Sequence, residues 1–153
     1  MSLQTNKEVI RRHFEEIFNQ QHLEIIEAIT AQELIEHGVA PFQSAEVQET
    51  VSRRNGPEHM RATAHWLLSA FPDLHFTIQQ MVAEGDLVAV RCTMQGTHQG
   101  PFQGLVPTGK RVNGTRTDIF RVVNGKVVEH WANRDDLAMF FQLGVIQAPQ
   151  RKE

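Results

Sequence analysis

The sequence predicts an α+β fold with helices in its first half and antiparallel strands in its second half. Apolar residues recur at helical spacing up to about residue 71, whereas from residue 74 onward they alternate with polar residues as in half-buried strands. Short turn signals separate the strand-like segments, so neighbouring strands are expected to pair antiparallel. Helices followed by a run of such strands are typical of an α+β domain.

Three helical segments are expected before residue 72. The first begins at residues 5–8, which have the spacing of a capping box. One face of this helix is formed by Ile10, His13, Phe14, Ile17 and Phe18. A shorter helical region is expected over residues 23–34, and a third helix over residues 57–71, ended by Pro72. The segment 38–56 contains Gly, Ser and Pro and is expected to be a long loop.

Four strands and a last helix are expected after residue 72. The strands cover residues 74–79, 87–95, 112–123 and 126–133. The Asn124-Gly125 pair predicts a tight hairpin between the last two strands. Asp135 can cap a final helix over residues 137–143, which stops at Gly144.

Length and composition indicate one domain over residues 1–153, with enough residues to bury a core. The net charge is −3 and no basic run occurs, so no nucleic-acid partner is expected. Cys92 is the single cysteine, which leaves no intramolecular disulfide and no cysteine cluster for zinc. We find neither a signal-peptide pattern nor a membrane-spanning segment, so the expected location is cytoplasmic and no membrane partner is expected.

The glycine-rich stretch 96–112 resembles a phosphate-binding loop at first sight. Such a loop needs a Ser or Thr after its Lys, and a helix after its turn. Here Arg111 follows Lys110, and the next segment has a strand pattern. We therefore expect a long connection between two strands, with Phe102 folded over the mouth of a cavity.

Seven short motifs occur in a fixed order along the chain. They are FPDL at 71–74, AEGD at 83–86, GTH at 96–98, PTG at 107–109, IFR at 119–121, GKVVEHW at 125–131 and QLG at 142–144. In these motifs the chain resembles SnoaL-like polyketide cyclases (ester cyclases), a family within the ketosteroid-isomerase and nuclear-transport-factor superfamily.

This resemblance implies a fold, an assembly and a reaction. The implied fold is a cystatin-like α+β barrel, in which a strongly curved antiparallel sheet and N-terminal helices form a cone around a pocket. The implied assembly is a homodimer. The implied reaction is an intramolecular aldol closure on a small hydrophobic carbonyl substrate, with no metal and no cofactor.

Asp118 is the first candidate catalytic residue. Aldol chemistry needs a base that removes a proton beside a carbonyl and a donor that stabilises the enolate oxygen. Asp118 lies in an apolar strand, and the resemblance places an acidic catalytic group on this part of the sheet. A buried carboxylate needs a partner, and Arg116 or Arg91 is expected to supply it and to contribute to substrate binding.

Two histidines are further catalytic candidates by resemblance. His37 falls where the isomerases place their catalytic carboxylate, and a histidine can act as a base near neutral pH. A loop histidine bonded to backbone is the equal alternative. His98 resembles a cyclase histidine near the pocket mouth, although a bend at Gly96 makes its facing uncertain from the pattern.

Aromatic residues are the expected walls of the pocket. Because neighbouring strand residues face opposite sides, His130 and Trp131 cannot both point inward on a regular strand. Trp131 is the expected cavity wall, since its broad ring can stack on a flat substrate, and His130 is expected to pack elsewhere. Phe14 and Phe18 are core residues that can also form the floor of the cone.

Other functions stay open on the sequence alone. The chain has no tyrosine, so steroid isomerisation through tyrosine donors is not expected. A hydrolase of the epoxide-hydrolase type, or a protein that only binds a hydrophobic ligand in the same cone, are the alternatives.

Overall fold

The computed structural model describes residues 2–37, 56–147 and 149–150. The loop expected over residues 38–56 lies outside this part of the chain, apart from Gly56. The elements, in chain order, are α1 (Leu3–Arg12), the π-helix η1 (His13–Asn19), the 3₁₀ turn η2 (Leu23–Ile25), α2 (Ile26–Ile29), β1 (Thr30–Glu36), α4 (Gly56–Ala70), β2 (His75–Glu84), β3 (Leu87–Thr97), β4 (Arg111–Val123), β5 (Lys126–Arg134) and α5 (Asp136–Leu143).

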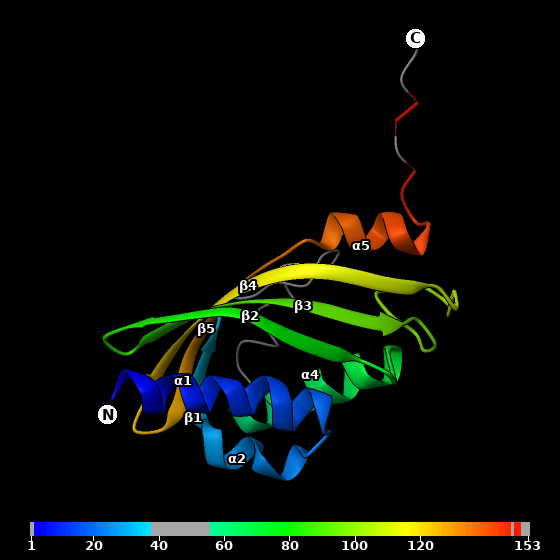
Figure 1. Ribbon diagram of the computed structural model, residues 1–153. Helices are drawn as coiled ribbons and strands as arrows, with labels where there is room; N and C mark the ends of the chain where they lie inside the picture. The colour runs from blue at the N-terminus through cyan, green and yellow to red at the C-terminus, as the bar shows by residue number, and fades with distance from the viewer. Residues whose placement is uncertain (1, 38–55, 148, 151–153) are drawn as a thin grey trace.

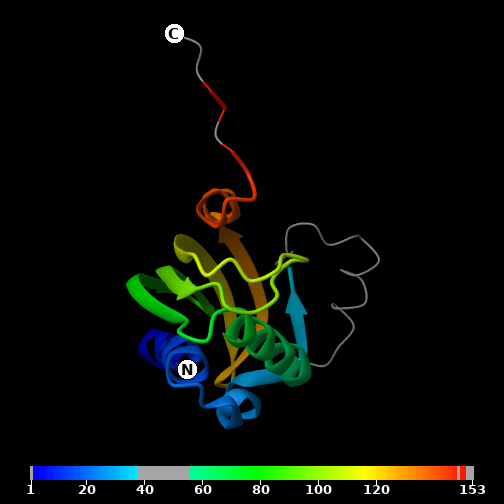
Figure 2. The same cartoon turned by 90° about the vertical axis from the view of Figure 1, so that its right-hand side faces the viewer.

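The five strands form one curved, open sheet in the order β1-β5-β4-β3-β2, and α1, α2 and α4 lie on one side of it (Figure 1). β2 to β5 are antiparallel neighbours, whereas β1 runs parallel to β5. The N-terminal helices pack against the β2 side of the sheet, and α4 packs against β1 (Figure 2). The α+β class and the curved sheet with N-terminal helices are thereby confirmed.

The inner face of the sheet carries the apolar residues of the alternating pattern. On β3 these are Val88, Val90, Cys92 and Met94, all of which are buried. A cluster of phenylalanine rings in edge contact joins the helices to the sheet, with Phe14 and Phe18 each lying 5.2 Å from Phe76, between ring centroids. The alternation therefore places a continuous core between sheet and helices.

Three local predictions about the last segments are confirmed. Asn124 and Gly125 both have positive φ, 50° and 77°, as the predicted tight hairpin requires. The side chain of Asp135 accepts a hydrogen bond from the N–H of Ala138 at the start of α5. Gly144 ends this helix in the left-handed conformation.

The first half departs from the prediction in two places. The N-cap of α1 is Ser2, whose Oγ accepts the N–H of Thr5, so the helix begins before the expected capping box. The helical region expected over residues 23–34 breaks at Ile29 and becomes the strand β1. Its pairing with β5 shifts register between Thr30 and Ile35, so β1 lacks the regular alternation that would have revealed it.

Within the described residues, no helix is long and apolar enough to cross a membrane.

Candidate active site

Asp118 lies in the middle of β4 and points to the inner face of the sheet, where its side chain has 0% exposure. Its main partner is Arg116, two residues earlier on the same face. The guanidinium donates from Nε to Oδ2 over 2.7 Å and from Nη2 to Oδ1, so the pair is bidentate. Arg116 also covers the ring of Phe76, with 5.6 Å between its Cζ and the ring centroid.

His130 of β5 is the second partner of Asp118. Its Nε2 lies 2.9 Å from Asp118 Oδ1, and its Nδ1 lies 2.7 Å from Oε2 of Glu36 on β1. The imidazole stacks on Phe120, with 4.4 Å between ring centroids and 11° between ring planes. His59 of α4 approaches the same Glu36 oxygen with its Nε2, at 3.9 Å. Three strands and one helix thus supply one buried row of ionisable groups.

The electrostatics of this row favour its charged forms. Burial alone would raise the pKa of Asp118, but the Arg116 charge and hydrogen bonds from His130 and Arg116 hold it well below its usual value. Burial alone would lower the pKa of His130, but hydrogen bonds to Asp118 and Glu36 raise it. Asp118 is therefore an ionised carboxylate at neutral pH.

A second buried histidine behaves in the opposite way. His13 of η1 lies against Phe14, Phe18 and Phe120. Burial, followed by the positive charge of His130, lowers the pKa of His13 to about 3. His13 is consequently neutral beside the charged row.

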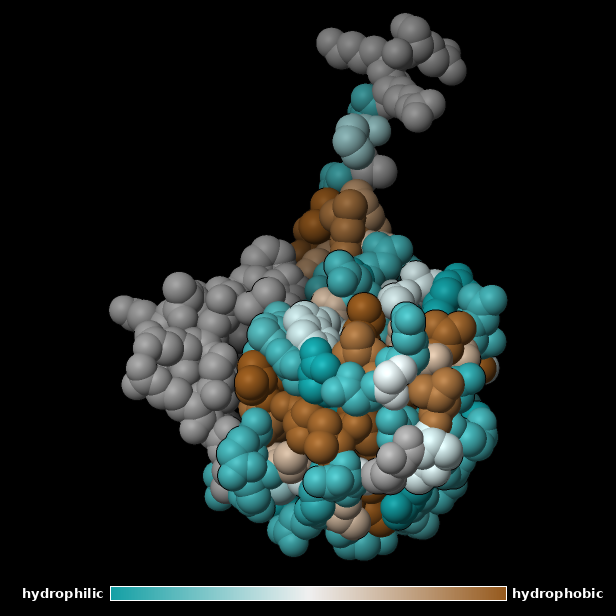
Figure 3. Space-filling view, turned by 90° about the vertical axis from the view of Figure 1, so that its left-hand side faces the viewer, coloured by the Kyte–Doolittle hydropathy of each residue, from teal (hydrophilic) through white to brown (hydrophobic). Residues whose placement is uncertain are grey.

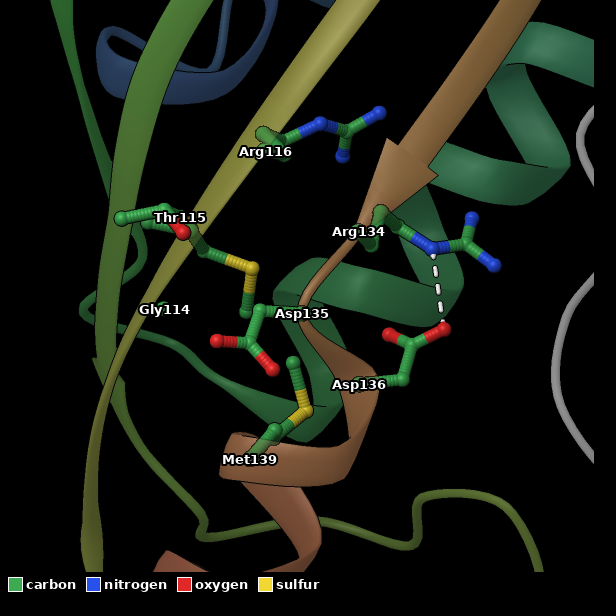
Figure 4. A pocket seen from close by; sticks show the side chains of 8 residues that line it. Gly114, Thr115, Arg116, Arg134, Asp135, Asp136 and Met139 are labelled. Atoms are coloured by element: carbon green, nitrogen blue, oxygen red, sulfur yellow. Dashed lines mark hydrogen bonds and ion pairs between the residues drawn. The ribbon is translucent and has the colours of Figure 1, made fainter.

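A small pocket of about 20 Å³, partly open to solvent, leads to Arg116 from the α5 side (Figure 4). Its lining residues are Met94, Gly114, Thr115, Arg116, Arg134, Asp135, Asp136 and Met139. Arg134 and Asp136 form an ion pair at 3.3 Å in this lining. Arg116 connects the two parts of the site, because it is one of the residues that line the pocket and its guanidinium binds Asp118.

No group of three or more His, Cys, Asp or Glu side chains within the described residues has an arrangement that could hold a metal ion.

Comparison with known proteins identifies the family. The family model described as SnoaL-like polyketide cyclase matches residues 8–143. The chain belongs to the SnoaL-like polyketide cyclase family. The resemblance seen in the sequence motifs is confirmed by this match.

Individual relatives agree with the family. The aklanonic acid methyl ester cyclase DnrD of Streptomyces peucetius is 32% identical over 90 residues, which cover 58% of this chain and 62% of that protein. The aligned part thus spans under two thirds of the length of the relative. Among solved structures, IdmH of Streptomyces antibioticus, a candidate polyketide cyclase, is 31% identical with a TM-score of 0.72 and covers 91% of this chain and 98% of its own. AclR of Streptomyces galilaeus, a candidate hydroxylase, is 29% identical with a TM-score of 0.76. The match covers 95% of this chain and 100% of the AclR chain.

In this SnoaL-like chain, His37 and Trp131 lie on the outer face of the sheet. Trp131 is paired with Ile119, whereas His130 is paired with Phe120 and faces the interior. His37, with 41% side-chain exposure, stacks on Trp131 and binds Glu129. The structure therefore reverses the expected facing of His130 and Trp131, and it separates His37 from Asp118 by the sheet. The catalytic role expected for His37 and the substrate-binding role expected for Trp131 stay predictions.

Arg91 also lies away from Asp118. It is paired with Thr117 on the neighbouring strand, is exposed, and donates to the side chain of Gln79. Of the two arginines proposed as partners of the carboxylate, the structure brings only Arg116 to it.

His98 and Phe102 lie at the far end of β3. Asp118 is paired with Val90, and His98 follows eight residues later. At about 3.3 Å per residue, this separation is on the order of 25 Å along the strand, so His98 and Asp118 do not converge. His98 is buried beside Phe71 and Phe102, with its Nδ1 accepting the N–H of Thr108.

Glu36, His130 and Phe76 belong to the site but were not among the sequence-based candidates for catalysis or binding. The GKVVEHW motif contained His130, and only the strand register could have shown that this side chain faces inward. Glu36 falls just after the helical region that the sequence pattern assigned to residues 23–34. The Phe14 and Phe18 rings do lie in the core, next to Phe76, whose ring Arg116 covers.

Proposed function

We propose that this protein is a polyketide cyclase that closes a ring by an intramolecular aldol reaction, without metal or cofactor. The observation that carries the proposal is the buried Asp118–Arg116 pair, whose arginine is also one of the residues that line a small pocket. The matched family and the cyclase name of DnrD support the same reaction class. By the same analogy, the proposed substrate is a carbonyl-rich ester of the aklanonic acid methyl ester type.

In the proposed mechanism Asp118 carries the proton and Arg116 stabilises the negative charge that develops on oxygen. Asp118 removes a proton from the carbon beside a carbonyl, and the carbonyl oxygen becomes an enolate. Arg116 has five N–H donors, and its hydrogen bonds to Asp118 use two of them, so others can donate to the enolate oxygen from the pocket side. The enolate carbon then attacks a second carbonyl carbon, and the proton on Asp118 passes to the new alkoxide. Substrate and product are isomers.

The substitution Asp118→Asn tests this mechanism. It keeps the side-chain size and removes the base, so turnover of aklanonic acid methyl ester should fall by ~10²–10⁴. Product mass gives a second criterion, because cyclisation leaves the mass unchanged whereas hydroxylation adds one oxygen.

A matched control is Asp86→Asn. Asp86 also forms an ion pair with an arginine, Arg121, but the pair lies on the surface, away from the candidate site. This variant should retain wild-type turnover. Equal turnover in Asp118→Asn and wild type would rule out Asp118 as the base, and binding of the ester without any conversion by the wild type would favour a ligand-binding protein.

A further inference from the structure

We propose that Glu36 is a positioning residue of the candidate site, which acts through His130 to hold Asp118 in the orientation needed for proton transfer. The inference deepens the proposed function and depends on it for the activity readout. Its structural part depends only on the contacts among Arg116, Asp118, His130 and Glu36.

The first argument is the hydrogen-bond chemistry of His130. Its two ring nitrogens face carboxylate oxygens of Asp118 and Glu36, at 2.9 and 2.7 Å. An ionised carboxylate only accepts hydrogen bonds, and a neutral imidazole has one N–H. Both contacts are satisfied together when His130 is an imidazolium that donates to each side.

The second argument is charge balance in a buried row. Arg116 and His130 are cations, Asp118 and Glu36 are anions, and the four form one connected row. Without the charge of Glu36, two cations would face a single buried carboxylate. Because an uncompensated buried charge is costly, His130 would then lose its proton more easily.

Within the described residues, the other titratable groups close to His130 include two histidines and one arginine. His13 of η1 is neutral, and the cation Arg116 lies on β4. His59 of α4 approaches Glu36 at 3.9 Å. Among these groups, the carboxylates that contact the ring are therefore those of Asp118 and Glu36.

The third argument concerns which oxygen of Asp118 reacts. A carboxylate has about four acceptor positions. Oδ1 accepts from Arg116 Nη2 and His130 Nε2, whereas Oδ2 accepts from Arg116 Nε alone. The imidazolium held by Glu36 thus occupies Oδ1 and leaves Oδ2 as the oxygen that can take the substrate proton.

The test is ¹⁵N NMR of histidine side chains in the wild type and in Glu36→Gln. The ring of His130 is assigned by comparison with a His130→Gln sample. In the wild type, His130 should stay doubly protonated well above pH 6.5. In Glu36→Gln its midpoint should fall by at least about one pH unit, a tenfold loss of proton affinity.

Activity provides a second readout. Glu36→Gln should lower kcat by about tenfold and move the alkaline limb of the pH–rate profile to lower pH, with a smaller change in KM. Glu36→Asp should recover part of both effects, since it restores the charge. Glu33→Gln, at an exposed position of the same strand, is the matched control and should behave as wild type.

The outcomes separate the two proposals. A wild-type His130 that becomes neutral near pH 6.5, or identical His130 titrations in wild type and Glu36→Gln, would overturn the role of Glu36. The first of these outcomes does not depend on the folding of Glu36→Gln. The expected NMR shift in a protein that converts no ester would support the role of Glu36 and contradict the proposed cyclase function.

Discussion

Asp118 shows how a single buried residue depends on its partners. A buried ion pair is costly to break from one side, by about 3–5 kcal/mol, because the remaining charge is left uncompensated. Arg116 and His130 both contact this carboxylate, so its ionisation and its orientation have the same cause. The side chain that supplies the proposed chemistry is thus held by three hydrogen bonds.

His13 predicts how stability depends on pH. Its pKa is about 3 in the folded protein, lowered by burial from 6.5, so protons bind preferentially to the unfolded chain. Its stabilising contribution is present above pH 6.5 and is lost as pH falls toward 3, with a slope of up to about 1.4 kcal/mol per pH unit. Urea denaturation at pH 7, 5 and 4 should show a shallower loss for His13→Leu than for wild type.

The control for this prediction is His75→Leu, at an exposed position of β2, which should keep the wild-type slope. If stability fell with pH equally steeply in His13→Leu and in the wild type, His13 would not be the source of this pH dependence. His130 has the opposite sign, because its raised pKa stabilises the fold below pH 6.5 and this contribution is lost as pH rises through the folded-state value.

At the residue level, the sequence identified Asp118 and its partner Arg116, but it assigned the wrong facing to His130. The reason is a register shift between Arg121 and Val122 in the pairing of β4 with β5. A regular hairpin from Val123 and Lys126 would set Asp118 opposite Trp131, whereas the bulge sets Phe120 opposite His130. A shift of one residue exchanges the two faces of a strand, and no residue type in the segment signals it.

Besides β4 and β5, which carry Asp118 and His130, two further elements bring residues to the site: β1 and α5. β1 brings Glu36 to His130 because it joins the sheet parallel to β5. α5 brings Met139 to the pocket, and its start is fixed by the Asp135 cap. The cap and the stop of α5 follow from local residue chemistry and were predictable. The strand β1 was not, because its irregular pairing hides the alternation.

The cap of α5 can be tested by substitution. Asp135→Ala removes the acceptor for the N–H of Ala138 and should lower the free energy of unfolding by about 1 kcal/mol. Asp135→Ser keeps a capping oxygen and should recover most of this loss. Chemical denaturation of the wild type and the two variants measures these free energies of unfolding. Equal stability of Asp135→Ala and Asp135→Ser would show that the cap does not stabilise α5.

On the scale of the whole molecule, the curved sheet separates two faces with different chemistry. The inner face holds the charged row and the phenylalanine cluster. The outer face carries an apolar row that crosses four strands in register: Val82, Ala89, Ile119 and Trp131. Val82 is 65% exposed and Ile119 is 39% exposed. On the side where the β2–β3 and β4–β5 turns lie, apolar side chains gather within a polar surround (Figure 3).

The homodimer implied by the family resemblance stays a prediction, and the outer face is where we expect it to form. Beside the apolar row lie the cation Arg121 and the anions Glu129 and Asp86, so two copies related by a two-fold axis can match opposite charges. Light scattering should give the mass of a dimer for the wild type and of a monomer for Ile119→Lys. A monomeric wild type at the same concentration would contradict this expectation.

The central claim is that Asp118 removes a proton from carbon. Deuterium exchange into the substrate in D₂O measures this step without requiring ring closure. Wild-type protein and Asp86→Asn should catalyse exchange at the carbon beside the carbonyl at equal rates, and Asp118→Asn should be slower by at least about 10². Exchange at the same rate in all three proteins would contradict the account.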